Sequence, residues 1–435
     1  MIRKLVLVLG AMVALTLAWS APANAQDQAT TVIHAGTLID GTQNQPRENV
    51  TIRIEGNRII SVENGFQRAR RGETLVDLKN ATVMPGFIDM HTHLTSQLGP
   101  GSYMDRFTQN EADVALQAAQ YAQRTLHAGF TTVRDLGDSF GASIALRNAI
   151  NNGIVVGPRV FTAGKSVATT GGHADPSNGY RDGLVSTPGP NEGVVNGPLE
   201  AREAVRARYQ DGSNLIKITA TGGVLSLAAS GDNPQFMTDE LEAIVATARD
   251  YNMRVAVHAH GKEGMLRAIR AGVDSIEHGT YMDDEVFAAM REHGTWYVPT
   301  ITAGKSVAER AEIEGFFPPQ VRPKARAIGP LIQSTFGRAY AAGVRIAYGT
   351  DSGVYDHGEN AREFGYMVEA GMPPLEAIRA ATAYAAELLA QTESLGTIEE
   401  GKFADIVAVN GNPLRDISIL RNIHFIMKDG VIYRQ

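Results

Sequence analysis

The sequence has no cysteine among its 435 residues. The folded chain therefore holds no disulfide bridge, and it offers no thiol for a lipid anchor. Beyond the N-terminal segment, no apolar run is long enough to span a bilayer. Positive charge is not in excess either, because the formal net charge is −7. We therefore expect neither nucleic acid nor a membrane among the partners of this protein.

The first 25 residues have the pattern of a secretory signal peptide. Arg3 and Lys4 supply a positive start, residues 5–19 an apolar core, and Ala23-Asn24-Ala25 a cleavage site of small residues. Cleavage after Ala25 takes two positive charges from the formal −7 and leaves −9. We expect a periplasmic or secreted protein.

Short strands separated by turns occupy both ends of the remaining chain. Alternating apolar residues with turns such as Asp40-Gly41 run from Thr31 to about Val83, and the same texture returns near the C-terminus around Lys428-Asp-Gly430. Each end alone would make only a thin sheet. We predict that residues 26–83 and 393–435 pair into one small β-sandwich domain, with the rest of the chain inserted between them.

Residues 84–392 alternate between strand and helix patterns. Several of the helices end at a glycine directly before the next strand, as at Ala271-Gly272. The predicted strands are 87–93, 130–135, 158–163, 214–219, 254–260, 273–278, 295–300 and 344–350. This pattern predicts a (β/α)8 TIM-like barrel of the α/β class, with its active site at the C-terminal strand ends. A doubly wound sheet is the competitor, and it is disfavoured because no G-x-G-x-x-G follows the first strand.

Polar side chains stand at the C-terminal ends of five predicted strands. His91 and His93 are two residues apart, so they project from the same face of a strand. An isolated pair of this kind is more often two hydrogen-bonded rings than a metal site. Lys217, His258, His260, His278 and Asp351 stand at or near the ends of four further strands. Core packing does not readily produce such a convergence, and imidazole suits first-row metals.

Lys217 is a charged amine within the otherwise apolar strand 214–219. An ordinary interpretation is a solubilising residue on an edge strand. On a central barrel strand, the buried ammonium would be costly unless it were paired or neutralised. Reaction of the free amine with carbon dioxide would neutralise it, and the carbamate would supply oxygen ligands able to bridge two cations.

Several of these motifs resemble the amidohydrolase superfamily. They are Pro85-Gly-Phe-Ile-Asp-Met-His-Thr-His93, Lys217, His258, His278 and Gly349-Thr-Asp351, and the flanking β segments match as well, so the resemblance covers nearly all of the mature chain. Residues 257–261 and 272–279 are similar to the imidazolonepropionase-related, prolidase-like peptidases and carboxypeptidases. The chain is most like the bacterial ochratoxin A-degrading amidohydrolases.

The resemblance implies a centre of two divalent metal ions, with zinc as the first choice. In that arrangement one ion is bound by His91, His93 and Asp351, the other by His258 and His278, and an N6-carboxylated Lys217 bridges them. The ions would lower the pKa of a bridging water. Asp351 would orient the resulting hydroxide and pass its proton to the leaving amine nitrogen.

Four further residues are candidates for substrate contacts. His258 and His260 share a strand face, so alternation leaves open which one binds metal. The family pattern assigns the metal to His258 and leaves His260 as a catalytic residue that contacts the substrate carbonyl, although it would otherwise bond a neighbouring loop. His173 lies in a Gly-rich and Pro-rich loop, predicted at 165–212, of the kind that often binds ligands. The backbone amides of Gly222 and Gly223 could receive a carboxylate, or simply form a turn.

Together these features predict a secreted, metal-dependent amidohydrolase of the carboxypeptidase or dipeptidase type. Its substrate would be a small peptide-like amide with a free carboxylate: a dipeptide, an N-acyl amino acid, or ochratoxin A, from which a residue such as Phe is released. A lactonase or cyclic-amide hydrolase on the same metal centre is the alternative. A non-catalytic binding barrel is disfavoured because every expected ligand position is filled. The resemblance also implies a homo-oligomer, and some relatives are octamers.

Overall fold

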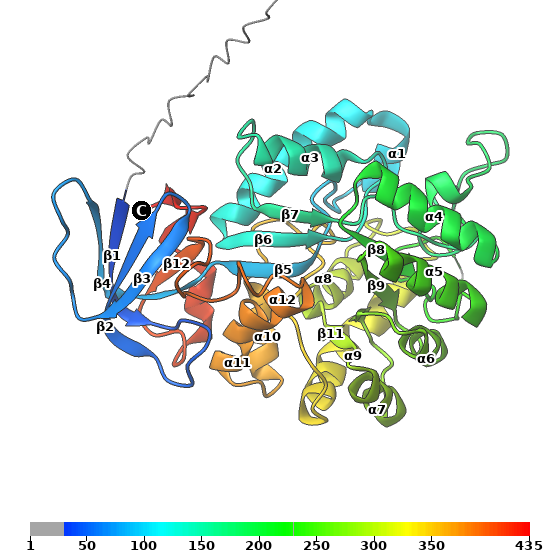
Figure 1. The fold of residues 1–435 in the computed structure, drawn as a ribbon. Helices are drawn as coiled ribbons and strands as arrows, with labels where there is room; N and C mark the ends of the chain where they lie inside the picture. The colour runs from blue at the N-terminus through cyan, green and yellow to red at the C-terminus, as the bar shows by residue number, and fades with distance from the viewer. Residues whose placement is uncertain (1–29, 229) are drawn as a thin grey trace, which may run out of the picture.

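Both ends of the chain contribute strands to one mixed sheet. The computed structural model describes residues 30–228 and 230–435, and the predicted signal peptide lies outside the described residues. The strands are β1 (Thr30–Leu38), β2 (Arg47–Glu55), β3 (Arg58–Asn64), β4 (Thr74–Pro85), β12 (Ile406–Asn410), β13 (Phe425–Lys428) and β14 (Val431–Arg434). Their order is β14-β13-β12-β4-β1-β2-β3, so the antiparallel pair β4–β12 joins the two chain ends (Figure 1).

This seven-stranded sheet curls around its own apolar core. Apolar residues of its strands, such as Ile33, Val50 and Ile52, are fully buried, and so is the intervening Thr51, so both faces of these strands are covered along part of their length. The strand β3 reaches back to the segment before β12, because Ile59 N donates to Lys402 O and Ala404 N donates to Asn57 O. The strands from the two chain ends therefore form one sheet folded over on itself, which is called the β-sandwich domain below.

The middle of the chain forms the barrel. Its strands are β5 (Phe87–Thr92), β6 (Phe130–Asp135), β7 (Arg159–Thr162), β8 (Leu215–Thr219), β9 (Arg254–Ala259), β10 (Ser275–His278) and β11 (Trp296–Val298), all paired in parallel. A bridge between Val167 and Ile218 connects the end of β7 to β8. The bridges Tyr297–Ile346 and Thr92–Ser352 insert the segment 344–352 between β11 and β5. The ring is thereby closed, which confirms the predicted (β/α)8 architecture.

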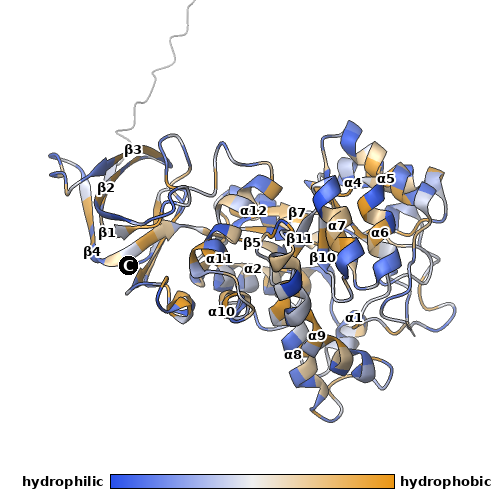
Figure 2. Ribbon diagram, turned by 90° about the horizontal axis from the view of Figure 1, so that it is seen from below, coloured by the Kyte–Doolittle hydropathy of each residue, from blue (hydrophilic) through white to orange (hydrophobic). Residues whose placement is uncertain are grey.

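Helices cover the outside of the barrel (Figure 1). They include α2 (Glu111–His127), α3 (Ala142–Asn151), α5 (Thr238–Asp250), α6 (Lys262–Ala271), α7 (Asp284–His293), α8 (Ile301–Ala311), α9 (Arg322–Ala341) and α10 (Arg362–Glu369). In α6 the buried Met265, Leu266 and Ile269 recur at helical spacing, and Gly272 ends the helix at φ 92°. Figure 2 shows hydrophobic colour concentrated on the inner strands. Among the described residues, no helix combines the length and apolarity that a bilayer crossing requires.

Two expectations about this region were wrong. The segment predicted as a loop at 165–212 ends in a helix, α4 (Pro198–Asp211). The inward face of α4 is formed by small or short side chains such as Ala201 and Ala204, so the sequence shows no strong apolar stripe there. The strand predicted at 344–350 is instead an extended segment joined by single bridges. The side chain of Asp89 takes the hydrogen bond of the Thr350 amide, where a strand ladder would use a neighbouring carbonyl.

An arginine ties the barrel to the β-sandwich domain. Arg159 in β7 donates to Asp405 Oδ2 at 2.6 Å and also pairs with Asp429 in the turn between β13 and β14. The side chains of Arg159 and Asp405 are only 15% and 6% exposed. The guanidinium also stacks over the ring of Phe403. Loss of the arginine would therefore leave the buried Asp405 carboxylate without a cationic partner, whereas Asp429 would keep its pair with Lys428.

We predict that Arg159→Met lowers the free energy of unfolding by about 3–5 kcal/mol, because removing one partner of a buried pair leaves an uncompensated charge. Urea denaturation followed by circular dichroism measures this change. The matched control is Arg421→Met, since the pair Arg421–Glu359 is about half exposed and should contribute less than about 1 kcal/mol. Equal effects of the two substitutions would contradict the proposed role of Arg159.

Candidate metal centre and active site

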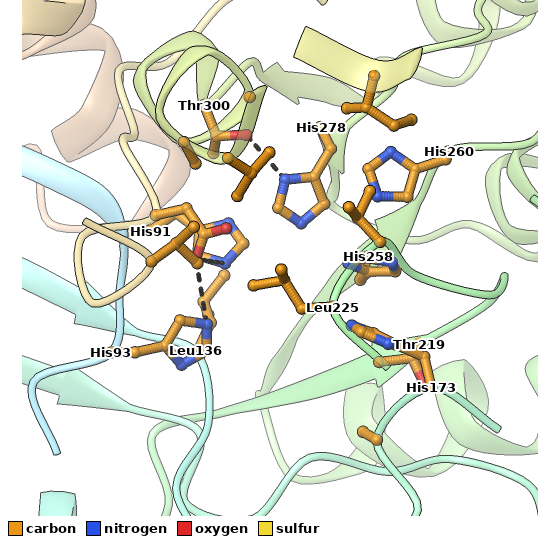
Figure 3. Close-up of a pocket in the computed structure, with 18 of the residues that line it drawn as sticks. His91, His93, Leu136, His173, Thr219, Leu225, His258, His260, His278 and Thr300 are labelled. Carbon is orange, nitrogen blue, oxygen red and sulfur yellow. Dashed lines mark hydrogen bonds and ion pairs between the residues drawn. The ribbon is translucent and has the colours of Figure 1, made fainter. Parts of the chain in front are cut away.

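The predicted ligand residues converge on one cavity at the C-terminal ends of the barrel strands. The cavity has a volume of about 300 Å³. Its walls include His91, His93, Lys217, His258, His260, His278 and Asp351, as well as His173 from the loop after β7 (Figure 3). The structure thus brings together all the residues for which a ligand role was predicted from separate strands.

The inner part of this cluster has the geometry of a cation site. Ligand atoms of His91, His278 and Asp351 all lie within 4.8 Å of one another. Asp351 Oδ1 is 3.4 Å from His91 Nε2 and 3.3 Å from His93 Nε2. Both Asp351 Oδ1 and His91 Nε2 are buried without a hydrogen-bond partner among the described residues. A divalent cation would satisfy both atoms, so this donor set fits a metal ion.

Three of the histidines are oriented through their Nδ1 atoms. His91 Nδ1 is 3.0 Å from Glu277 Oε2, and His278 Nδ1 is 2.7 Å from Thr300 Oγ1. His93 Nδ1 donates to the carbonyl oxygen of Gly137 at 3.0 Å. Histidines that bind metals usually hold one ring nitrogen on such a partner and present the other. The Nε2 atoms of these rings are therefore available to the cavity.

Glu277 and Arg134 form a buried support beneath His91. Arg134 Nη2 donates to Glu277 Oε1 at 2.7 Å, and the Ser275 hydroxyl donates to the same oxygen at 2.5 Å. Glu277 is fully buried and Arg134 is 2% exposed. Neither residue was among the predicted site residues. Each is a charged residue within a barrel strand, as Lys217 is, but both strands contain other polar residues, so the signal was weaker than that for Lys217.

Most of the histidines that line the cavity are neutral near pH 7. Burial lowers the pKa of His260 to about 4 and that of His173 to about 3, and it holds the pKa of His258 well below the usual value. His93 differs, because burial acts to lower its pKa but the contact with Asp351 outweighs this and raises it. Neutral imidazole is the form that binds metals, so burial prepares these side chains as ligands.

Lys217 is buried in β8 with 3% of its surface exposed. Burial lowers the pKa of its amine to about 8, against the opposing attraction of Glu277 and Asp351. An amine with this pKa has a sizeable neutral fraction near pH 7, whereas an exposed lysine has almost none.

Left-handed backbone conformations aim two candidate ligands into the cavity. His278 has φ 70° and Asp351 has φ 59°, and Thr300, which bonds His278, has φ 52°. Such conformations are costly for residues other than glycine and are concentrated at functional sites. Asp89 holds the turn at Asp351, because its carboxylate accepts hydrogen bonds from the Thr350 amide and hydroxyl.

The four predicted substrate contacts fare differently. His260 and His173 line the cavity, and His260 Nδ1 is 3.0 Å from Thr280 Oγ1. Gly222 and Gly223 are not among the residues that line the cavity, and the expectation for the Gly222 amide was wrong. The Gly222 amide already donates to the Asn233 carbonyl oxygen, so it is engaged within its own loop.

The opposite wall of the cavity is apolar. It is formed by Val224, Leu225, Ala303, Val307, Ile328, Ile332 and Val354, which come from the loop after β8, from α8 and α9, and from the turn after Asp351. No local pattern could identify these residues, because each looks like an ordinary core residue and only the fold assembles them. The cavity therefore has a polar half suited to chemistry and an apolar half suited to a hydrophobic side chain.

The fold and this cluster define a barrel protein with a centre suited to divalent cations. Residues 82–434 match the model of the Amidohydrolase family, and the chain belongs to this family. It is a hydrolase that acts on amide bonds.

Individual relatives match over nearly the whole chain. The ochratoxinase of Aspergillus niger is 33% identical over 438 residues, which cover 95% of this chain and 88% of that protein. A solved structure described as a Xaa-Pro dipeptidase with bound methionine in the active site is 52% identical, with a TM-score of 0.92, and covers 94% of this chain and all of the other. The crystal structure of the A. niger ochratoxinase is 31% identical with a TM-score of 0.79, covering 94% and 96% of the two chains.

We predict that Glu277→Gln lowers metal affinity or activity about 10- to 100-fold, because the amide no longer supplies two charged oxygens to hold His91 and Arg134. Metal retained after dialysis against a chelator, measured by mass spectrometry, reports the effect without a substrate. Glu263→Gln is the control, since Glu263 forms an exposed pair with Arg267 on α6. Unchanged metal retention and activity in Glu277→Gln would show that His91 does not need this partner.

Proposed function

We propose that this protein is an exported two-metal amidohydrolase that removes a residue with a free carboxylate from a small peptide-like amide. Dipeptides, N-acyl amino acids and ochratoxin A are the substrates proposed. The observation that carries the proposal is that one cavity holds both unpaired metal-type ligands and an apolar wall. The names of two relatives, ochratoxinase and Xaa-Pro dipeptidase, support this choice of substrates.

The residues that would hold the metals fall into two groups. His91, His93 and Asp351 would hold one zinc ion, His258 and His278 the other, and carboxylated Lys217 would bridge them. The lowered pKa of Lys217 supports the carbamate, because only the neutral amine reacts with carbon dioxide. When bound, the ions supply a water acidified enough to act as a nucleophile near neutral pH.

Asp351 is suited to carry the proton between water and leaving group. Burial acts to raise its pKa, but the attraction of His91 and His93 outweighs burial and lowers it, so the carboxylate is charged at neutral pH. Its Oδ1 has no other hydrogen-bond partner in the described chain and borders the cavity. With Oδ1 facing the metal ion, this carboxylate would accept a proton at its other oxygen, Oδ2, and deliver it to the amine nitrogen as the amide bond breaks.

His260 is suited to stabilise the substrate carbonyl oxygen. Its neutral ring carries one proton, and when the Thr280 hydroxyl donates to Nδ1 that proton resides on Nε2. The Nε2–H group then donates to the oxygen on which negative charge develops.

The remaining parts of the proposal concern location and assembly. The N-terminal pattern of residues 1–25 supports export to the periplasm or beyond. We propose a homo-oligomer, which size-exclusion chromatography with light scattering will test directly.

We predict that the purified protein, supplied with zinc and bicarbonate, hydrolyses N-acyl amino acids and dipeptides that end in Phe, Leu, Pro or Gly, and ochratoxin A. Chromatography with mass spectrometry detects the released amino acid. A parallel set of lactones and cyclic amides tests the alternative chemistry. Turnover confined to that set would overturn the proposed substrate class.

We predict that Lys217→Ala reduces turnover more than about a hundredfold and lowers the metal content, because a bridging ligand contributes more than the supporting residues around it. Metal analysis and hydrolysis of the best substrate in the panel measure the two effects. Lys79→Ala, which changes a lysine 41% exposed in the β-sandwich domain, should leave both quantities unchanged. Normal metal content and turnover in Lys217→Ala would rule out the carbamate.

A further inference from the structure

The segment that follows β8 forms one side of the apolar half of the cavity. Residues 222–228, called the wall loop below, place Val224 and Leu225 in the cavity lining (Figure 3). Val224 belongs to a buried cluster with Val307 and Ile328 of α8 and α9, and Leu225 packs against the same cluster. The wall loop contains no helix and no strand. Its shape therefore depends on contacts from outside the loop.

Lys324 supplies three of these contacts. It lies in the first turn of α9 and donates from Nζ to the carbonyl oxygens of Gly223, Ser226 and Ala228, at 3.0, 2.8 and 2.8 Å. These bonds use all three donors of the ammonium group. Hydrogen bonds from a charged donor are roughly twice as strong as neutral ones. The Tyr103 hydroxyl adds a bond to Leu225 O at 2.8 Å, and the Gly222 amide donates to the carbonyl oxygen of Asn233 at 3.0 Å.

The wall loop also touches the polar half of the cavity. A Cβ atom added to Gly223 would lie 2.2 Å from the His173 ring, so the loop backbone packs directly on that ring. The His173 ring in turn stacks on His258, with ring centroids 4.3 Å apart. The carbonyl oxygen of Gly222 lies 3.2 Å from His258 Nε2. Displacement of the wall loop would therefore change the space between the rings of His173 and His258 and the apolar wall.

Lys324 is a cation near the cavity, so an alternative role would be to bind the carboxylate of the substrate directly. The hydrogen bonds favour a role for Lys324 in holding the wall loop, because its three donors already point at backbone oxygens of that loop. A carboxylate could replace them only by breaking the bonds that order the loop.

We propose that Lys324 is a positioning residue that fixes the wall loop, and that the ordered loop makes the enzyme select amides whose released residue has a bulky apolar side chain. This inference rests on the proposed amide-hydrolase function and specifies its substrate class. The physical reason concerns the free energy of binding. Burial of an apolar side chain contributes fully to it only when the wall is already ordered, because ordering a loop on binding costs free energy. A residue without a side chain gains nothing from the same wall.

The test compares kcat and KM for N-acyl-Phe and N-acyl-Gly. Lys324→Met keeps the length of the side chain and removes its donors. We expect KM for the Phe substrate to rise about tenfold, with kcat changed by less than about threefold and KM for the Gly substrate by less than about twofold. Lys324→Arg should restore most of the Phe preference, because guanidinium also donates several hydrogen bonds. The control is Arg326→Met, also on α9, where the arginine is exposed and pairs with Glu312.

A second variant protects the test against simple misfolding. Leu225→Ala shortens the wall without altering Lys324, and it should raise KM for the Phe substrate in the same way. The double variant should show a shift smaller than the two single shifts combined, because both substitutions act on one wall. Additive shifts, or an equal loss on both substrates in Lys324→Met, would overturn the proposed role of Lys324. If the wild-type protein hydrolyses no amide, the proposed function itself falls; if it does so without preferring Phe to Gly, only the selectivity falls.

Discussion

The constraint on which the structure depends is the burial of many ionisable side chains around one cavity. Removing charges from water is costly, and the cost grows when several groups of one sign share a site. Most of the cavity histidines meet this constraint by remaining neutral, as the lowered pKa values of His258 and His260 indicate. The proposed carbamate of Lys217 would meet it by replacing an ammonium with an anion that cations can bind. The barrel then provides a rigid frame in which such groups are held without collapse.

The frame itself is shaped by buried polar networks. Glu277 connects Arg134 of β6 to His91 of β5, so one carboxylate joins two neighbouring strands from a third, β10. Asp89 acts similarly beneath Asp351, whose left-handed conformation interrupts the eighth extended segment of the barrel. This irregular backbone serves the site, because a regular strand would direct the Asp351 side chain away from the cavity. Such networks contribute specificity of geometry more than net stability.

The parts of the molecule that could be predicted from sequence are those with a local signal. The succession of strand and helix patterns identified the barrel strands. The two-residue period of side chains along a strand placed His91 and His93 on one face. The motifs shared with the amidohydrolases identified the remaining candidate ligands. The helix α4 was missed because Ala201 and Ala204 give it little hydrophobic contrast. The engagement of the Gly222 amide and the assembly of the apolar wall depend on contacts between distant segments, which no local pattern records.

The two halves of the cavity are therefore constrained in different ways. The polar half stands mostly on or next to strand ends, and four of its histidines are fixed there by partners at Nδ1: His91, His93, His260 and His278. The wall loop contains no strand, and three of its carbonyl oxygens are bound by Lys324 on a helix about a hundred residues away in sequence. A substitution on α9 or in the loop can change which side chain fits without disturbing the chemistry. In this fold, substrate selection and catalysis can consequently vary independently, even though Gly223 and His173 bring the two halves into direct contact.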